Sequence, residues 1–343
     1  MIITRTPFRV TLGGGGTDLP SYYSKYGGFI FSFALDKYMF IYVNRPIVDD
    51  LIRVKYSESE TVVSLKEVEH DIARSCMEKT GITKGLEITS MADIPAGSGL
   101  GSSSTYTVGL LNALHTMKRD YISLHDLAEE ACYIEIDKLK KPMGKQDQYL
   151  AAFGGFTVLE IARDGSVVVE KAKITYNTID KLKRNLLMFF TNKQRLNKDI
   201  LGAQDKSTQH SEKQVLKSLH YIKESGYRIL EIVESGKITE LGKMLDEHWQ
   251  YKKKLAKGIT NPDFDRIYDL AKKNGALGGK ISGAGGGGFF TFYCEQNHNQ
   301  LRAVMKKEEL RELKFDFDDE IIKGCVITRD SELVNEIIIK SRK

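Results

Sequence analysis

Three glycine clusters, far apart along the chain, constrain the fold more than any other feature of the sequence. The segments 13–16, 97–101 and 278–288 hold 14 of the 30 glycines. Glycine lets a backbone approach a ligand closely and point several N–H groups at one anion. For a single cluster, tight turns would be the better explanation. Three clusters, two of them next to an expected strand and helix, favour phosphate binding.

The length of 343 residues exceeds what one hydrophobic core usually serves, so we expect two domains, 1–183 and 184–343. Hydrophobic and charged fractions of 41% and 28% are typical of a globular protein. We find no apolar stretch long enough to span a membrane and no signal-peptide pattern, so we expect a soluble, cytoplasmic protein without a membrane partner. Its oligomeric state stays open between a monomer and a homodimer.

Charge and cysteine content exclude several classes of partner and site. The net charge is only +5, although residues 180–260 carry 17 Lys and Arg against 10 Asp and Glu. A nucleic-acid-binding protein normally has a stronger basic stripe, whereas a small anionic ligand or a solvated helix face fits this local excess. The four cysteines form no C-x-x-C pair and the seven histidines no metal-binding spacing, so we expect no structural metal.

The order of strand-like and helix-like segments predicts an α+β fold. Strands are expected within 1–13, 29–46, 85–95, 185–192, 287–294 and 324–330, with a β-hairpin around Asp164-Gly165. Helices are expected over 102–119, over 123–139 with Ser123 as N-cap, within 197–248 and over 301–309. These segments do not alternate as regular βαβ units, which disfavours a doubly wound sheet.

The middle glycine cluster is the most informative. From Pro95 to Leu114 the order is a proline, a glycine-rich loop, three serines and a helix. This places hydroxyl and N–H groups at a helix N-terminus, where the helix dipole favours an anion. It is not a Walker A loop, because no Lys follows the last glycine, and the similar Gly279-Lys280 is followed by Ile281. The G-x-G-x-G spacing disfavours a dinucleotide site, and the absence of H-R-D and D-F-G excludes a eukaryotic-type protein kinase.

PAGSGLGSSS at 95–104 resembles the ATP-binding motif of the GHMP small-molecule kinases, which include galactokinase, homoserine kinase and mevalonate kinase. RTPFRVTLGGGGTDLP resembles their N-terminal substrate motif, and KISGAGGGGFFTF resembles their third motif. The resemblance implies a two-domain α+β fold, with an S5-domain-2-like N-terminal domain and a ferredoxin-like C-terminal domain. It also implies ATP and Mg²⁺ as cofactors.

The resemblance carries over to the nucleotide and metal sites residue by residue. Ser104 stands where alanine is usual in the family, which keeps the position small. Ser103 and Glu135 resemble the family's magnesium ligands, and Mg²⁺ takes hard oxygen ligands, usually few of them from protein. From its context alone, Glu135 is also consistent with a solvated helix face. The implied nucleotide site comprises Pro95, Gly97, Ser98, Gly99, Leu100, Gly101, Ser102, Ser103 and Ser104.

Two residues resemble the family's catalytic pair. Asp147, in the segment GKQDQY, corresponds to the Asp that accepts the proton of the acceptor hydroxyl or aligns that hydroxyl. From context alone, it is equally consistent with a helix N-cap. Arg9 corresponds to the basic residue that could pair with this Asp and stabilise charge on the transferred phosphoryl group.

Within the family, the motifs are most similar to the heptose 7-phosphate kinases. Galactokinases have Gly-Glu-His before Thr-Asp, where this chain has Gly14, Gly15 and Gly16, which disfavours galactose and leaves room for a phosphate-bearing sugar. The implied reaction is ATP-dependent phosphorylation of the anomeric hydroxyl of D-glycero-D-manno-heptose 7-phosphate, for cell-surface heptose biosynthesis. A fucose kinase, a nicotinamide-dependent oxidoreductase and a non-catalytic sugar-phosphate sensor are the alternatives.

The expected substrate site draws on both domains. The resemblance assigns Asp18 to sugar hydroxyls, since a carboxylate can accept two hydroxyl hydrogen bonds. Arg195 is favoured for the substrate phosphate because a guanidinium binds phosphate bidentately, whereas any single lysine of 252–254 fits a solvated helix face better. The expected site comprises Gly14, Gly15, Gly16, Thr17, Asp18, Arg195, Lys252, Lys253, Gly283, Ala284 and Gly285.

Overall fold

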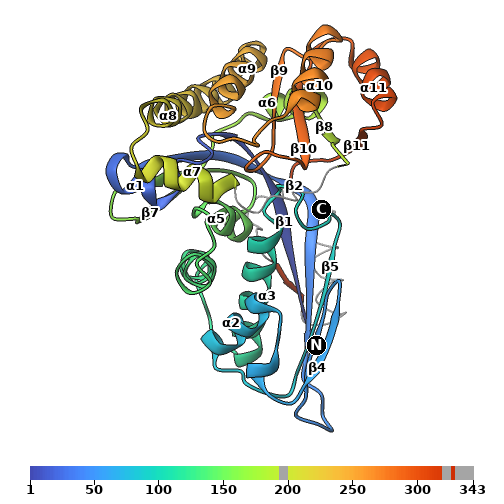
Figure 1. The fold of residues 1–343 in the computed structure, drawn as a ribbon. Helices are drawn as coiled ribbons and strands as arrows, with labels where there is room; N and C mark the ends of the chain where they lie inside the picture. The colour runs from blue at the N-terminus through green and yellow to red at the C-terminus, as the bar shows by residue number, and fades with distance from the viewer. Residues whose placement is uncertain (193–199, 319–325, 329–343) are drawn as a thin grey trace.

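The structure, a computed structural model, describes residues 1–192, 200–318 and 326–328. Its described strands form two sheets, and helices pack on both (Figure 1). Apart from the strand Val326–Thr328, the first sheet comes from the N-terminal half of the chain, and the second comes from the C-terminal half. The α+β class is therefore confirmed. In the part of the chain that the structure describes, no helix is both long and apolar enough to cross a bilayer.

The first sheet contains eight described strands in the order β12-β1-β2-β5-β3-β4, with β6 and β7 branching from β2. The long strand β2 makes this branching possible, because Gly28–Phe33 pairs with β6 and Met39–Asn44 pairs with β5. Among the described strands of this sheet, only the pair β3 and β5 is parallel. The strands are β1 (Ile2–Gly13), β2 (Gly28–Asn44), β3 (Ile52–Lys55), β4 (Ser59–Val62), β5 (Leu86–Ala92), β6 (Phe156–Ile161), β7 (Val167–Lys171) and β12 (Val326–Thr328).

Helices α2 and α3 pack on one face of this sheet (Figure 1). Helix α3 approaches β1 and β2 closely at Gly109, where a Cβ atom would lie 2.9 Å from Thr6 Oγ1 and 3.2 Å from Ile41. The predicted hairpin is confirmed as β6 and β7, and Ser123 caps α4 as expected. The helices of this half are α1 (Pro20–Tyr26), α2 (Asp71–Thr80), α3 (Ser102–Lys118), α4 (Leu124–Cys132), α5 (Gln146–Phe153) and α6 (Tyr176–Asn185).

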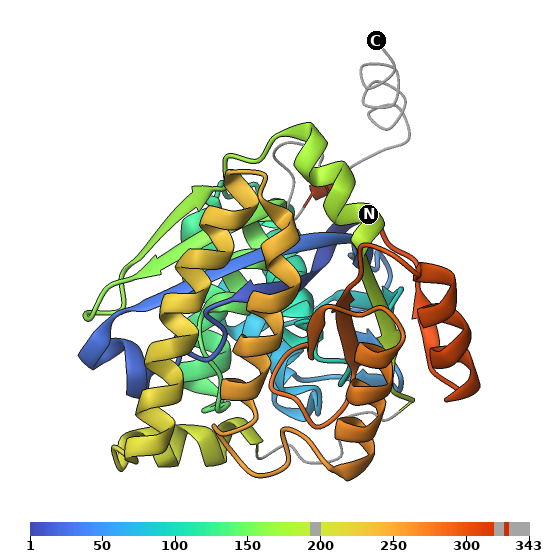
Figure 2. The same cartoon turned by 90° about the horizontal axis from the view of Figure 1, so that it is seen from above.

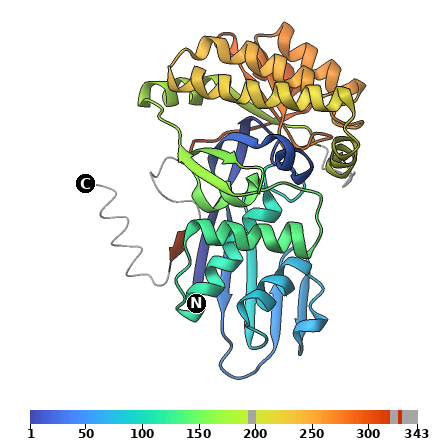
Figure 3. The same ribbon diagram turned by 90° about the vertical axis from the view of Figure 1, so that its left-hand side faces the viewer.

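The second sheet has four described strands in the order β11-β8-β10-β9, all antiparallel. The long helices α8 and α9 lie side by side (Figures 2 and 3); α8 packs against β1 and β2 of the first sheet and α9 against β9 of the second. The strands are β8 (Leu186–Phe190), β9 (Gly278–Ile281), β10 (Phe289–Tyr293) and β11 (Arg311–Leu313). The helices are α7 (Ile200–Gln209), α8 (Lys213–Glu234), α9 (Leu241–Lys252), α10 (Pro262–Lys273) and α11 (His298–Lys307).

Two hydrophobic clusters hold the domains together. One fills the C-terminal domain around the fully buried Trp249. The other fills the N-terminal domain and continues into the C-terminal one through residues such as Ile229 of α8 and Leu245 of α9. The contact between the domains is therefore apolar and packed like a core, which disfavours large relative motions of the domains.

The last part of the described chain departs from the predicted domain division. The strand β12 pairs with β1 of the first sheet, and Phe317 forms an isolated bridge with Leu35 of β2. After building the second sheet, the chain thus returns to the first domain, which a single boundary at 183/184 does not provide for. That boundary falls within α6, one turn before β8 begins.

Candidate active site

A cavity of about 570 Å³ lies where the three glycine clusters converge. The N-terminal domain contributes β1, the loop before α3 and the start of α5, and the C-terminal domain contributes α7, α9 and the loop between β9 and β10. The residues that line the cavity include Arg9, Thr11, Gly15, Gly16, Asp18, Gly97, Gly99, Gly101, Ser102, Ser103, Lys141, Gly144, Gln146, Asp147, Gln204, His248, Lys252, Lys280, Gly283 and Ala284.

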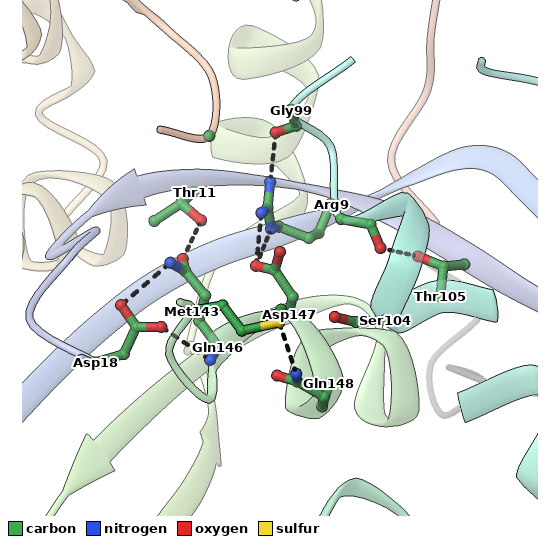
Figure 4. A network of polar contacts seen from close by, with 12 residues as sticks. Arg9, Thr11, Asp18, Gly99, Ser104, Thr105, Met143, Gln146, Asp147 and Gln148 are labelled. Carbon is green, nitrogen blue, oxygen red and sulfur yellow. Dashed lines mark hydrogen bonds and ion pairs between the residues drawn. The ribbon is translucent and has the colours of Figure 1, made fainter. Parts of the chain in front are cut away.

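Arg9 and Asp147 form an ion pair in the cavity wall (Figure 4). The guanidinium donates from Nε and Nη2 to Asp147 Oδ1, at 2.8 and 2.5 Å. Its third nitrogen, Nη1, donates to the carbonyl oxygen of Gly99 at 2.8 Å. Because both bonds from Arg9 use Oδ1, the second carboxylate oxygen is left without a protein partner among the described residues. Arg9 thus holds the carboxylate against the glycine-rich loop.

Asp18 lies at another part of the cavity and is almost fully buried. Its carboxylate accepts hydrogen bonds from the backbone N–H groups of Gly16 and Gln146, each at 3.1 Å, and from Gln146 Nε2 at 3.2 Å (Figure 4). Burial raises the pKa of Asp18 to about 6, against which the bond from the Gln146 backbone acts. Gly144 must lack a side chain, because a Cβ there would lie 2.1 Å from Asp18 Oδ2.

The loop before α3 has the backbone geometry of an anion site. Gly97, Gly99 and Gly101 have φ angles of 76°, 80° and 87°, which L-residues with side chains rarely adopt. The helix begins at Ser102 with Gly101 as N-cap, and no side chain of the described residues caps it. Its first N–H groups therefore remain available for a ligand, as does the buried Ser102 Oγ, which has no hydrogen-bond partner in the described chain.

Of the residues predicted for the nucleotide site, only part lines the cavity. Gly97, Gly99, Gly101, Ser102 and Ser103 do so. Of the others, Leu100 lies in the hydrophobic core, Ser98 is buried, Ser104 bonds to Glu135, and the exposed Pro95 precedes the loop.

Glu135 is completely buried, which contradicts a solvated helix face. It accepts hydrogen bonds from the hydroxyls of Ser103 and Ser104 and, at 2.9 Å, from Gln148 Nε2. The ammonium of Lys141 lies 3.7 Å from its Oε1 and 3.1 Å from Ser103 Oγ. Burial raises the pKa of Glu135, an effect that Lys141 counteracts. The oxygen atoms of these two side chains thus already have a cation beside them.

Glu135 owes its position to a π-helical segment. The helix that begins at Leu124 changes to π geometry over Tyr133–Lys138. Such π segments are rare in proteins, and those that occur are often found at functional sites. The altered winding turns Glu135 towards α3 and away from solvent. The neighbouring Tyr133 and Asp137 remain exposed.

The first glycine cluster serves packing as well as the cavity. Gly14 lies under β2, where a Cβ would be 1.8 Å from the Phe29 carbonyl oxygen, and Gly13 touches Gly226 of α8. Thr17 is buried and donates to the carbonyls of Gly14 and Phe29. Of the predicted residues in this cluster, Gly15, Gly16 and Asp18 line the cavity, whereas Gly14 and Thr17 do not.

The third cluster closes the cavity from the C-terminal domain. Gly283 and Ala284 line it, whereas Gly285 packs on the backbone of Ile259. Lys252 holds this loop by donating to the carbonyls of Ile281 and Gly283, at 2.7 and 2.6 Å.

Two basic residues predicted for the substrate remain to be placed, Lys253 and Arg195. Lys253 is not brought into the cavity, because it pairs with Asp265 at 3.2 Å. Arg195, predicted to bind the substrate phosphate, lies outside the described residues.

Sequence comparisons agree with this geometry. The description "GHMP kinases N terminal domain" matches residues 66–155, and "GHMP kinases C terminal" matches residues 229–311. The D-glycero-alpha-D-manno-heptose 7-phosphate kinase of Campylobacter jejuni is 31% identical over 90% of this chain and 94% of its own. The chain belongs to the GHMP kinase family. It is therefore a phosphotransferase of that family, and the predicted family resemblance is confirmed.

Other GHMP kinases are similar over nearly the whole chain. The structure of a D-glycero-D-manno-heptose 1-phosphate kinase from Bacteroides thetaiotaomicron has a TM-score of 0.79, with 26% identity over 96% of this chain and 99% of that one. An L-fucokinase/L-fucose-1-P guanylyltransferase of Bacteroides fragilis is 26% identical over 87% of this chain but only 35% of its own length. These relatives establish the two-domain fold of the family.

Several cavity residues of this GHMP kinase were missed by the sequence analysis, among them Gln146, Gln204, His248 and Lys280. Gln146 adjoins Asp147 in the segment GKQDQY, but the sequence does not reveal its hydrogen bonds. Its side chain donates to Asp18 and accepts from Thr11 Oγ1 at 2.7 Å. Gln204, His248 and Lys280 come from three separate elements of the C-terminal domain. No short motif joins them, and only the fold brings them to one cavity.

Proposed function

We propose that this kinase transfers the γ-phosphoryl group of ATP to the anomeric hydroxyl of D-glycero-D-manno-heptose 7-phosphate, giving the 1,7-bisphosphate. One observation carries the proposal: the Arg9–Asp147 pair joins the glycine-rich loop to the part of the cavity that holds Asp18. A nucleotide phosphate on the loop and a polyol at Asp18 would thus meet at Asp147. The similarity to a heptose 7-phosphate kinase supports this choice of sugar.

In the proposed reaction, the anomeric oxygen attacks the γ-phosphorus and the bond to the β–γ bridging oxygen breaks. The hydroxyl proton passes to Asp147, whose second carboxylate oxygen is the available acceptor. Arg9 keeps the carboxylate oriented and places positive charge beside the transferred group. An anomeric hydroxyl is more acidic than an ordinary alcohol, so one carboxylate is sufficient as base.

Asp18 and Gln146 are the groups proposed to orient the sugar. The carboxylate of Asp18 and the carboxamide of Gln146 face the cavity together and are fixed by their mutual hydrogen bonds. Sugar hydroxyls can donate to the former and exchange hydrogen bonds with the latter. Gly15 and Gly16 leave space beside them.

The residues present fit a magnesium ion. Ser103 and Glu135 supply the hard oxygen atoms that Mg²⁺ requires, and the approach of Lys141 shows that cations are favoured beside them. Bound there, Mg²⁺ would neutralise charge on the phosphates of ATP. With ATP and a phosphorylated sugar as its proposed substrates, we propose that the enzyme acts in the cytoplasm and that its product serves cell-surface heptose biosynthesis.

An ADP-release screen tests the proposal. The wild-type enzyme with Mg·ATP should turn over heptose 7-phosphate faster than L-fucose, galactose or unphosphorylated heptose. A preference for L-fucose would instead support the alternative kinase, and sugar binding without ADP release would indicate a sensor.

Asp147→Asn tests the role of the base. It should lower kcat by about 10²- to 10⁴-fold with the KM for ATP unchanged, since this is the usual range for a general base. The matched control is Asp137→Asn, on an exposed position of the π-helical segment. Near-wild-type turnover by Asp147→Asn would refute the assignment.

A further inference from the structure

We propose that Gln204 and Lys280 bind the substrate's own phosphate, from the C-terminal side of the cavity. The inference rests on the proposed function, because it assumes a sugar that already carries a phosphate. The two residues lie on different elements, α7 and β9, and both line the cavity.

Lys280 has one donor to spare. It is 3% exposed, and its ammonium donates to the Leu12 carbonyl at 2.6 Å and to His248 Nε2 at 3.4 Å. An ammonium has three N–H donors, so the third has no partner among the described residues. Burial lowers the pKa of Lys280 to about 7, with a smaller contribution from the nearby charge of Arg9. A bound oxyanion would offset that burial and stabilise the charged form.

His248 fixes the direction in which Lys280 points. Ser225 uses its single hydroxyl proton to donate to the Ile222 carbonyl, so its Oγ accepts from His248 Nδ1–H at 3.0 Å. This leaves Nε2 of the imidazole unprotonated and able to accept from Lys280. Burial lowers the pKa of His248 well below its ordinary value, as this neutral form requires. His248 is therefore a positioning residue.

The side-chain amide of Gln204 likewise has a donor without a partner among the described residues. Its side chain is 3% exposed, and Nε2 has no hydrogen-bond partner in the described part of the chain. A buried donor left unsatisfied costs free energy that a ligand oxygen can recover. Gly16 makes the position possible, because a Cβ there would lie 2.7 Å from Gln204 Nε2. The missing side chain at position 16 thus gives Gln204 access to the substrate.

The order of contacts along β1 places the pair at the sugar end. Arg9 contacts the glycine-rich loop, Leu12 receives Lys280 three residues later, and Gly16 meets Gln204 beyond the strand. Three residues of a strand span roughly 10 Å. That separation suits a molecule accepting a phosphoryl group at one end and carrying a phosphate at the other.

The other cationic side chains of the cavity have different partners. Arg9 pairs with Asp147, Lys141 lies against Ser103, and Lys252 supports the third glycine cluster. Lys280 alone among the described cavity-lining cations combines a free donor with a position near the first glycine cluster.

Steady-state kinetics on the full-length enzyme test the inference. Lys280→Met and Gln204→Leu should each raise the KM for heptose 7-phosphate by tenfold or more, with the KM for ATP changed less than twofold. Their kcat/KM for the same heptose without its phosphate should stay within about twofold of wild type. The matched controls Lys243→Met and Gln209→Leu, both exposed, should match wild type with either sugar. Gln204→Glu keeps the side-chain shape but should weaken the binding of the phosphorylated substrate only. The loss should exceed that of Gln204→Leu.

Three results would overturn the inference. The first is an equal loss of kcat/KM with both sugars. The second is a raised KM for ATP, which would assign the pair to the nucleotide. The third is a wild-type KM for heptose 7-phosphate in all three variants. A wild type that prefers the unphosphorylated sugar overturns the proposed function itself, and the inference with it. A wild type that prefers heptose 7-phosphate, with variants impaired on both sugars alike, overturns the inference only.

Discussion

Asp18 should make the protein less stable as the pH rises, and Asp18→Asn should remove this dependence. The carboxyl is buried, and its pKa is about 6 in the folded protein against an ordinary value of 3.8. Between these values the folded state binds more protons than the unfolded state, so stability falls with rising pH. The full difference of about two pKa units corresponds to about 3 kcal/mol, of which about 2 kcal/mol develops between pH 4.5 and 7.5.

The assay is urea denaturation of both proteins at pH 4.5, 6 and 7.5. Asparagine brings an NH₂ group towards donors on Gly16 and Gln146, which costs about 1–3 kcal/mol at every pH. The informative quantity is therefore the change with pH of the difference between the two unfolding free energies. It should move by about 2 kcal/mol in favour of Asp18→Asn from pH 4.5 to 7.5. A difference that stays constant with pH would refute the reasoning.

Three further substitutions separate the parts of the site. Glu135→Gln should raise the Mg²⁺ concentration needed for half-maximal activity by about tenfold or more, because a metal site loses affinity when a charged ligand is replaced by a neutral one. An unchanged Mg²⁺ titration would contradict the ligand role. Gly144→Ala should raise the KM for the sugar and leave the KM for ATP unchanged, because the alanine Cβ would lie 2.1 Å from Asp18 Oδ2. Gly288→Ala should do the reverse, since its Cβ would lie 2.1 Å from the Ser98 carbonyl oxygen; steady-state kinetics with each substrate varied would expose a failure of either.

The sequence predicted those parts of the site that lie within short, contiguous motifs. The loop of 97–101 has the positive φ angles that its glycines allow, and α3 begins at Ser102 as expected. The catalytic assignments for Arg9 and Asp147 remain predictions, which the ion pair between them supports. The relevant physics is local in the loop, where only glycine adopts the conformation without strain.

Residues that depend on long-range packing could not be predicted. Lys280 begins the third motif, KISGAGGGGFFTF, and forms part of the rejected Walker A match, but neither pattern assigns it a ligand, and its contact with Leu12 spans 268 positions. Lys252 and Lys253 are neighbours in sequence, yet one supports the third glycine cluster and the other pairs with Asp265. Successive residues of a helix point about 100° apart, so a run of lysines cannot share one task. Only the packed structure shows which of them faces the cavity.

One hairpin of the C-terminal domain touches both ends of the cavity. At its loop end, Gly288 packs against the Ser98 carbonyl of the glycine-rich loop, and in its first strand Lys280 donates to the Leu12 carbonyl. These contacts lie eight residues apart, on β9 and the loop that leads to β10. The hairpin thus bridges the glycine-rich loop and β1, and it would help to hold a nucleotide and a sugar at a fixed separation if they bind there as proposed. An in-line transfer requires the reacting atoms to be held within a few tenths of an ångström, and a short hairpin seated on a core-like interface is stiff enough to hold them.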